Sequence, residues 1–198
     1  MRKPTDLRQK VLDASLALIK EGGLDRLSMR EVARKAGVSH QGPYHYFEDR
    51  EAILAAIASE GFSKLGRSLG AAAQTGSDPA KAVENVGRAY VDFALRNPAY
   101  FQAMFRADAV PLDRYPDARQ REDEAFGDLV EGVGKAFADQ PSDVRQSIAI
   151  ACWAMVHGLA TLILEGSLAR KLKIPRGRQR KVADEVIGTF MRLLGNCV

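Results

Sequence analysis

The chain has 198 residues, of which 46% are hydrophobic and 27% are charged, so it can bury a sizeable core and is not expected to be disordered. Its 29 Lys and Arg against 25 Asp and Glu give a net charge of +4, a mildly basic balance that is compatible with a nucleic-acid partner but does not demonstrate one. Two cysteines, Cys152 and Cys197, exclude a disulfide framework or a zinc cluster and favour a reducing compartment. The basic first residues are not followed by an apolar stretch, so no signal peptide is expected.

A helix that contains no fully charged residue is expected from Ser147 to Leu164, and its length is near the lower limit for crossing a membrane. His157, Gly158 and Thr161 interrupt its apolar character, and many of its apolar residues are alanines. A buried helix of a soluble bundle therefore explains the run better than a membrane span. No membrane contact is expected, and the predicted location is cytoplasmic.

The first expected helix covers residues 7–21, where apolar residues recur at helical spacing, and Gly22 is expected to end it. A capping box opens the next helix. In this box the Ser28 hydroxyl can accept a hydrogen bond from the Glu31 amide, and the Glu31 carboxylate can reach back to the Ser28 amide. Gly37 is expected to end this second helix.

Ser39 is the expected N-cap of a third short helix that reaches about Tyr46. Two short helices that meet at Gly37, with Val38 as the apolar residue between them, have the spacing of a helix-turn-helix, here within residues 28–47. Such a unit can offer the start of its second helix to the DNA major groove while its first helix crosses the backbone. The sequence therefore predicts a DNA-binding motif.

The remainder of the chain also carries helical patterns and no alternation typical of strands. Asp78-Pro79 and Asn97-Pro98 are expected helix starts, because proline is tolerated in the first turn. The predicted fold class is all-α with about nine helices, in which residues 1–50 form a DNA-binding domain and residues 51–198 a second domain. Its helices are expected at 51–73, 79–96, 98–106, 118–138, 143–169 and 182–194.

The positive charge is distributed unevenly. Residues 1–50 hold ten Lys and Arg against seven Asp and Glu, whereas residues 51–198 hold nineteen against eighteen. Most of the excess therefore lies in the predicted DNA-binding domain. A second basic stretch at 170–181 is typical of a solvated connector, and a further nucleic-acid surface is the alternative.

The stretch from Leu7 to Leu54 resembles the tetracycline-repressor (TetR) family of transcriptional regulators. The residues that carry the resemblance are Ser28, Ala36, Gly37, Val38, Ser39, Tyr44, Phe47 and Arg50. A second similarity, to a subgroup with a Trp-x-x-x-His-Gly element in a late helix, rests on Trp153, His157, Gly158 and Pro43-Tyr44. The resemblance implies that the remaining residues form a ligand-binding and dimerisation domain.

The resemblance also implies which residues contact DNA. Gln41 would make a bidentate contact to adenine, and His40 would donate to guanine N7 or O6. Tyr44 and Arg50 would contact phosphates, and His45 would contact a phosphate or a base. The implied DNA-binding residues are Ser28, Ser39, His40, Gln41, Gly42, Tyr44, His45 and Arg50.

Simpler roles remain open for several of these residues. Ser28 and Ser39 could act only as helix caps, Tyr44 could be a packed aromatic side chain, and His40 and His45 could be exposed without a partner. Pro43 departs from an ideal recognition helix because it lacks an amide, so the helix is expected to start one residue late.

Aromatic and methionine residues suggest a ligand cavity in the second part of the chain. Each residue alone is more typical of a core, but together they could line an apolar cavity, with His157 orienting the ligand. His157 could instead be a core histidine that bonds a backbone carbonyl. The candidates are Tyr90, Phe93, Phe101, Met104, Phe105, Trp153 and His157, and the expected effector is small and largely apolar or aromatic.

No phosphate-binding glycine loop, HExxH pair or nucleophile elbow is present, so no catalytic residue, metal or cofactor is expected. The predicted function is a ligand-responsive repressor that binds a palindromic double-stranded DNA operator. It would act as a homodimer formed through residues 143–169 and 182–194. The alternative is a small-molecule sensor or carrier with a vestigial DNA domain, against which Tyr44, Arg50 and the basic first quarter argue.

Overall fold

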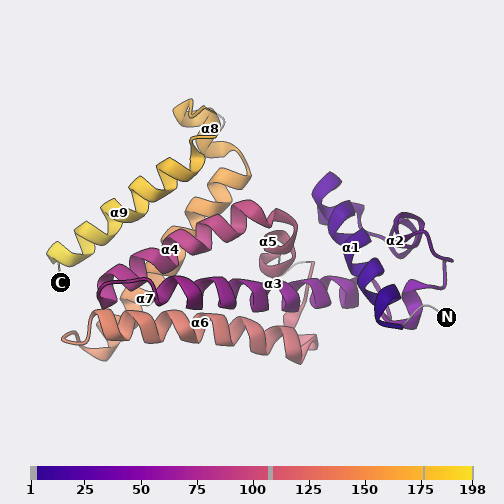
Figure 1. Cartoon of the computed structure of the whole chain (residues 1–198), viewed down its shortest axis with the longest axis horizontal. Coiled ribbons are helices and arrows are strands. Elements are labelled where there is room, and N and C mark those ends of the chain that lie inside the picture. Colours follow the sequence, from indigo (N-terminus) through magenta and orange to yellow (C-terminus); the bar gives the residue numbers. More distant parts are fainter. Residues whose placement is uncertain (1–3, 107–108, 176, 198) are drawn as a thin grey trace. The chain divides into compact units, whose positions relative to one another are not determined.

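The computed structural model describes residues 4–106, 109–175 and 177–197, and within them the chain forms nine α-helices, three 3-10 helices and no strand (Figure 1). The all-α prediction is confirmed. The chain divides into two compact units, of which the first comprises Met1–Ser63 and Asn97–Asp123 and the second Lys64–Arg96 and Glu124–Val198.

The first unit is built on helix α1 (Pro4–Gly22), which contacts both α2 (Met29–Ala36) and α5 (Pro98–Phe105). It also contains the first part of α3 (Arg50–Ala73) and the 3-10 helices η1 (Leu24–Arg26), η2 (Pro43–His45) and η3 (Leu112–Arg114). These elements share one buried apolar core, which includes Leu12, Ile19, Val32, Ile53, Ile57, Ala99 and Ala103.

The start and the end of α2 follow the expected chemistry. The Glu31 amide donates to the Ser28 hydroxyl over 3.2 Å, which confirms Ser28 as the N-cap. The hydrogen bond that the Glu31 carboxylate accepts comes from the Arg34 side chain, whose Nε lies 3.1 Å from Oε2. Gly37 ends the helix with φ of 67°, a left-handed conformation that glycine adopts without a steric penalty.

The segment after Gly37 differs from the predicted α-helix at 39–46. Its backbone makes i to i+3 hydrogen bonds, from the Gly42 amide to the Ser39 carbonyl (2.8 Å) and from the Tyr44 amide to the Gln41 carbonyl (3.1 Å). Pro43 has no amide with which to bond the Ser39 carbonyl, so an α-helical ladder cannot begin there. The regular structure is the short 3-10 helix η2, whose N-cap position is taken by Gly42 and not by Ser39.

The second unit is centred on α4 (Pro79–Arg96), which contacts α7 (Ser142–Leu164) and α9 (Gln179–Cys197). The Asp78 carboxylate caps α4 as predicted, because it accepts from the Lys81 amide over 2.8 Å. Helix α6 (Pro116–Ala136) contributes Val133 to the core of this unit, together with Val83, Ile148, Ala149 and Cys152 from α4 and α7.

The single helix predicted at 143–169 is two helices. Helix α7 ends at Leu164, Gly166 adopts φ of 70°, and α8 (Ser167–Leu172) follows. The left-handed conformation at Gly166 breaks the α-helical ladder. The α-helix predicted at 39–46 is absent, and α8 is an additional α-helix. The number of α-helices in the described residues therefore still agrees with the prediction.

Helix α7 is long and apolar enough to cross a membrane by length and composition alone. Its buried residues nevertheless pack within the second unit, where Ile148, Ala149 and Cys152 meet the core. This arrangement is that of a core helix in a helical bundle.

The border between the compact units does not fall at residue 50. It lies between Ser63 and Lys64, inside α3, and α5 belongs to the first unit although it follows α4 in sequence. Ala99 and Ala103 of α5 are part of the apolar core around α1, which explains the assignment.

Two glycines of the second unit predict opposite effects of an added methyl group. A Cβ at Gly132 in α6 would meet no atom within 4 Å, whereas a Cβ at Gly76 would lie 2.5 Å from the Ala82 amide nitrogen. We expect Gly132→Ala to raise the free energy of unfolding by about 1 kcal/mol, because alanine is the better helix former. Gly76→Ala should lower it, since a backbone atom cannot move aside cheaply. Thermal denaturation followed by circular dichroism measures both, and a lower midpoint for Gly132→Ala would contradict the described packing.

Candidate DNA-binding and effector-binding sites

The predicted DNA-reading residues gather on one exposed segment. Ser39, His40 and Gln41 are exposed in the turns before η2, and Tyr44 and His45 are exposed on η2 itself. The rings of His40 and Tyr44 lie 5.8 Å apart. The segment therefore presents an amide, an imidazole and a phenol together, groups that can contact base edges and phosphates.

Gly42 lies on the inner side of this segment and not on the exposed side. It is buried, and a Cβ there would lie 2.9 Å from Val38 Cγ2 and 3.0 Å from the Ser39 carbonyl oxygen. The tight turn therefore has no room for a side chain at Gly42. This residue shapes the turn, whereas the sequence placed it facing the groove.

The exposed segment is held from below by buried residues. Pro43 is fully buried and Phe47 nearly so, and the Phe47 amide donates to the Pro43 carbonyl over 3.0 Å. The Arg8 guanidinium of α1 lies over the Phe47 ring, 5.4 Å from its centroid, in a cation–π contact. The first helix thus supports this exposed segment directly.

Arg50 has a backbone partner within the first unit. Its Nη2 donates to the Leu24 carbonyl over 2.9 Å, and the side chain is partly buried. This bond ties the start of α3 to η1, so Arg50 positions the motif in addition to the phosphate contact that the sequence predicts. The long sequence separation of the pair explains why sequence patterns do not reveal it.

Helix α2 adds a basic side chain that sequence reasoning missed. Arg30 is exposed two residues after the N-cap Ser28, in the first turn of α2. Arg34 pairs with Glu31, and the resulting hydrogen bond holds the pKa of the Glu31 carboxyl below its usual value. The sequence signal that could have identified Arg30 as a candidate phosphate contact is its position in the first turn of a helix that begins at an N-cap serine.

The predicted effector residues are divided between the two compact units. Phe101, Met104 and Phe105 belong to α5 in the first unit, where the Phe101 and Phe105 rings lie 4.9 Å apart. Phe62 joins them, at 5.6 Å from Phe105. The structure places the remaining predicted residues in the second unit, namely Tyr90, Phe93, Trp153 and His157.

Within the second unit, Tyr90, Trp153 and His157 come together. The Tyr90 hydroxyl lies 2.9 Å from His157 Nδ1, and the Trp153 and His157 rings are 6.1 Å apart. Burial raises the pKa of the Tyr90 hydroxyl far above its usual value and lowers the pKa of the His157 imidazole. The Nδ1 atom of His157 thus lies next to a phenol hydroxyl. The alternative given by the sequence, a core histidine, had a backbone carbonyl as the partner.

Phe126 is a further member of this ring cluster that sequence reasoning missed. It comes from α6 and lies 5.5 Å from Trp153, and both rings are more than a third exposed. Aromatic rings that are partly open to solvent, beside a partly buried polar pair, have the composition of a ligand site. The apolar pair Phe126 and Val130, one helical turn apart on an otherwise acidic helix, was the available signal.

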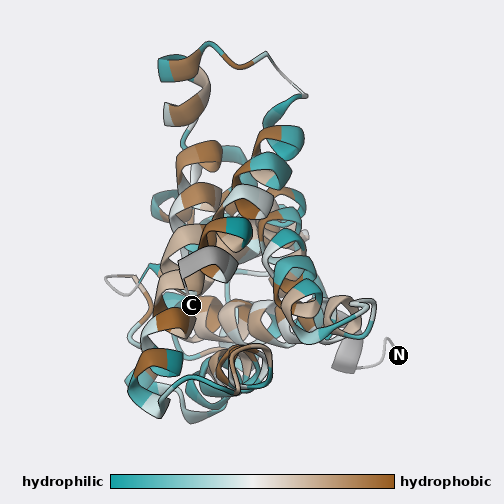
Figure 2. Cartoon of the chain, turned by 90° about the vertical axis from the view of Figure 1, so that its left-hand side faces the viewer, coloured by the Kyte–Doolittle hydropathy of each residue, from teal (hydrophilic) through white to brown (hydrophobic). Residues whose placement is uncertain are grey.

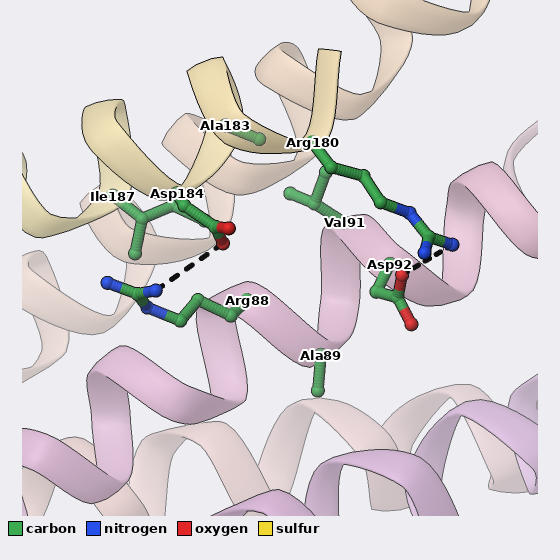
Figure 3. Close-up of a pocket in the computed structure, with 8 residues that line it drawn as sticks. All are labelled: Arg88, Ala89, Val91, Asp92, Arg180, Ala183, Asp184 and Ile187. Carbon is green, nitrogen blue, oxygen red and sulfur yellow. Dashed lines mark ion pairs between the residues drawn. The ribbon is translucent and has the colours of Figure 1, made fainter. Parts of the chain in front are cut away.

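Two hollows in the second unit have linings that the sequence did not predict. The groove between α4 and α9 has a volume of about 380 Å³ and is crossed by two ion pairs, Arg88 with Asp184 (3.5 Å) and Arg180 with Asp92 (2.7 Å), as Figure 3 shows. A larger hollow of about 600 Å³ lies between the end of α3, the start of α4 and α6. One arginine of the basic connector, Arg180, is therefore engaged with α4.

Comparison with known proteins decides the family. A model described as "Bacterial regulatory proteins, tetR family" matches residues 11–57, and a model described as "Tetracyclin repressor-like, C-terminal domain" matches residues 83–190. The chain belongs to the TetR family. The first model covers the exposed segment and its supporting helices, and the second covers most of the unit that contains Tyr90, Trp153 and His157.

Curated relatives of this TetR-family chain include regulators from several bacteria. The HTH-type transcriptional repressor KstR of Mycolicibacterium smegmatis is 30% identical over 100 residues, which cover 50% of this chain and 49% of KstR. The HTH-type transcriptional regulator BetI of Serratia proteamaculans is 37% identical over 71 residues, 36% of each chain. The chain spans about half or less of the length of these relatives.

Solved structures of similar fold cover almost the whole TetR-family chain. A protein of unknown function from Rhodococcus sp. RHA1 is 29% identical, with a TM-score of 0.78 over 97% of this chain and 96% of its own. FadR from Bacillus subtilis, solved in complex with stearoyl-CoA, has a TM-score of 0.69 at 13% identity over 91% of this chain and 95% of its own. The likeness to FadR is one of fold.

The Arg50–Leu24 bond predicts that Arg50 also stabilises the TetR-family helix-turn-helix. We expect Arg50→Ala to lower the free energy of unfolding by about 1–2 kcal/mol, because the buried carbonyl of Leu24 loses a charged donor. Thermal unfolding measures the loss. Arg30→Ala is the matched control, since Arg30 is exposed on α2, and its midpoint should stay unchanged. Equal midpoints for both variants would show that the bond adds nothing to stability.

Proposed function

We propose that this chain is a ligand-responsive transcriptional regulator, a cytoplasmic homodimer that represses by binding a palindromic operator. The observation that carries the proposal is the exposed segment Ser39–His45 on a turn held by the core of the first unit, in a chain of the TetR family. The relative KstR is named a transcriptional repressor, which supports the sign of regulation. An enzymatic role finds no support in this family of regulators.

In this proposal, the residues of the exposed segment divide into base-reading and phosphate-contacting groups. The Gln41 amide offers a donor and an acceptor, which match the N7 and N6 positions of adenine, and His40 reads a neighbouring guanine. Tyr44 and Arg50 contact phosphates, as do the amides at the start of α2 after Ser28, and His45 contacts a phosphate or a base. Two such segments, one from each protomer, would enter successive major grooves.

Dimerisation is proposed through α7 and α9. Ile150 and Leu162 of α7 and Val186 and Leu193 of α9 are exposed large apolar side chains, and hydrophobic stretches recur along these helices in Figure 2. Between the two residues of α7 lie small side chains, including Ala151, Ala154 and Gly158, which let a second helix approach closely. Monomers rarely expose large apolar patches. We therefore propose that a second copy of the chain buries these side chains by completing a four-helix bundle.

The proposed effector site is the ring cluster of the second unit, formed by Tyr90, Phe126, Trp153 and His157. Its rings favour a small, largely apolar or aromatic molecule, and the fold relative FadR is seen with stearoyl-CoA, a ligand with a long apolar chain. The similarity to the subgroup with a Trp-x-x-x-His-Gly element rests on two of these residues. Phe101, Met104 and Phe105 remain proposed effector contacts of the first unit.

Release of the operator on effector binding requires that the effector bind the DNA-incompetent conformation more tightly than the competent one. A small-molecule sensor with a vestigial DNA domain is the second candidate. The exposed Gln41 and Tyr44 on a tightly supported turn favour the regulator, because a vestigial domain has no use for them.

Gln41 provides the test of base reading. We expect Gln41→Ala to relax the preference at one base pair of each half-site, at a cost of about 1–3 kcal/mol, because the bidentate contact is lost. Tyr44→Phe, which removes only a phosphate contact, should weaken binding to all sequences alike. Titration of operator variants selected from random DNA measures both effects. An unchanged preference at every position in Gln41→Ala would remove Gln41 from the reading surface.

Leu193 and Ile150 provide the test of assembly. We expect Leu193→Glu combined with Ile150→Glu to give monomers that bind operator weakly, because two charges would enter an apolar interface. Phe190 and Leu194 are less suitable targets, since they pack on the core of the second unit. Leu172→Glu is the matched control, as Leu172 is 65% exposed on α8, outside the proposed interface. Sedimentation that shows a dimer for the double variant would overturn the assignment.

A further inference from the structure

The hollow between α3, α4 and α6 is separate from the ring cluster of the second unit. Its volume of about 600 Å³ lies within the range of about 300–1,000 Å³ that is typical of small-molecule sites. The end of α3, the start of α4 and the second half of α6 line it, and all three segments belong to the second unit (Figure 1). Among the described residues that line it, none is a member of the ring cluster.

Two glycines keep this hollow open. Gly70 of α3 and Gly132 of α6 both line it, and a Cβ on either glycine would meet no further atom within 4 Å. Packed helices normally leave few voids larger than a water molecule, so a hollow of this size is a feature of the surface that needs an explanation. Its apolar lining comes from Leu69, Ala73, Pro79, Ala82, Val86 and Leu129. The lining therefore favours a ligand with an apolar body.

The charged side chains of the lining are three carboxylates and one ammonium, and two of the carboxylates are already matched. Lys135 Nζ lies 2.6 Å from Glu131 Oε1, so these two residues neutralise each other. The Asp78 carboxylate caps α4, where it accepts from the Lys81 amide over 2.8 Å and from the Ser77 hydroxyl over 2.9 Å. The amides at the start of α4 thus stabilise the Asp78 charge.

Asp128 is the third carboxylate, and its charge is not matched. It is exposed on α6, and among the described residues it has no hydrogen-bond or ion-pair partner. Because it is exposed and also lines the hollow, its carboxylate lies at the rim, one helical turn before Gly132. An unmatched carboxylate beside an apolar surface attracts cations and repels anions.

We propose that this hollow is a further small-molecule site, which binds an organic monocation whose apolar body covers Leu69 and Leu129 and whose ammonium group pairs with Asp128. The apolar lining selects the body of the ligand, and the unmatched carboxylate selects its charge. The site is additional to the ring cluster proposed for the effector. Its occupation requires no DNA, so the inference stands or falls separately from the proposed regulation.

The first experiment compares three probes that share one apolar body and differ in charge. They are 1-adamantylammonium, 1-adamantanol and adamantane-1-carboxylate, each titrated at neutral pH into the full-length protein without DNA. The amide signals of Gly70 and Gly132 in ¹H–¹⁵N spectra report binding in the hollow. We expect the ammonium to bind about two- to fivefold more tightly than the alcohol, as one exposed ion pair allows, and the carboxylate to bind most weakly.

Two results of this titration would overturn the inference. The first is an ammonium that binds no more tightly than the alcohol or the carboxylate, since the hollow would then not select a cation. The second is an ammonium titration that leaves both glycine signals unshifted. A shift confined to the Trp153 indole signal is one form of this second result, because it would locate the probe in the ring cluster.

The second experiment tests the role of Asp128. We expect Asp128→Asn to bind the ammonium about as weakly as the alcohol and to bind the alcohol as the unaltered protein does. Glu165→Gln is the matched control, since Glu165 is an exposed carboxylate at the end of α7 that does not line the hollow, and this variant should keep the preference. An unchanged preference in Asp128→Asn, or an equal loss in both variants, would overturn the inference.

Discussion

The exposed segment from Ser39 to His45 depends on the apolar core against which it packs. The segment from Ser39 to Tyr46 is held mainly by i to i+3 bonds, whose geometry is poorer than that of an α-helix, so its own backbone fixes its conformation weakly. Pro43 and Phe47 anchor it in the core that α1, α2, α3 and α5 share, and the Arg8 cation covers the Phe47 ring. The buried residues on the inner face of this turn thus fix the backbone that carries the exposed side chains.

Local chemistry accounts for what the sequence could predict. Ser28, Asp78 and Gly37 each satisfy or end a helix through atoms within a few residues, and their roles appear in the structure as the sequence indicated. The resemblance in residues 7–54 likewise singled out the segment that the structure shows to be exposed. The break at Gly166 was missed because a single glycine between Glu165 and Ser167 does not reveal which conformation it adopts.

Long-range partners account for what the sequence could not predict. Arg50 with the Leu24 carbonyl and Tyr90 with His157 join residues far apart in the chain, and only the tertiary fold brings them together. Gly42 shows a related limit. Its burial follows from the backbone path around Val38, which no pattern of residue types specifies.

The chain passes from one compact unit to the other three times, after Ser63, after Arg96 and after Asp123. A fragment that stops near residue 60 would lack Ala99 and Ala103 and would expose the apolar surface that they cover. Recombination between relatives at a single crossover point within residues 64–96 would separate α5 from the core in which it is packed. In a folded chimera of two such regulators, residues 97–123 and the amino-terminal segment would both have to come from the same parent protein.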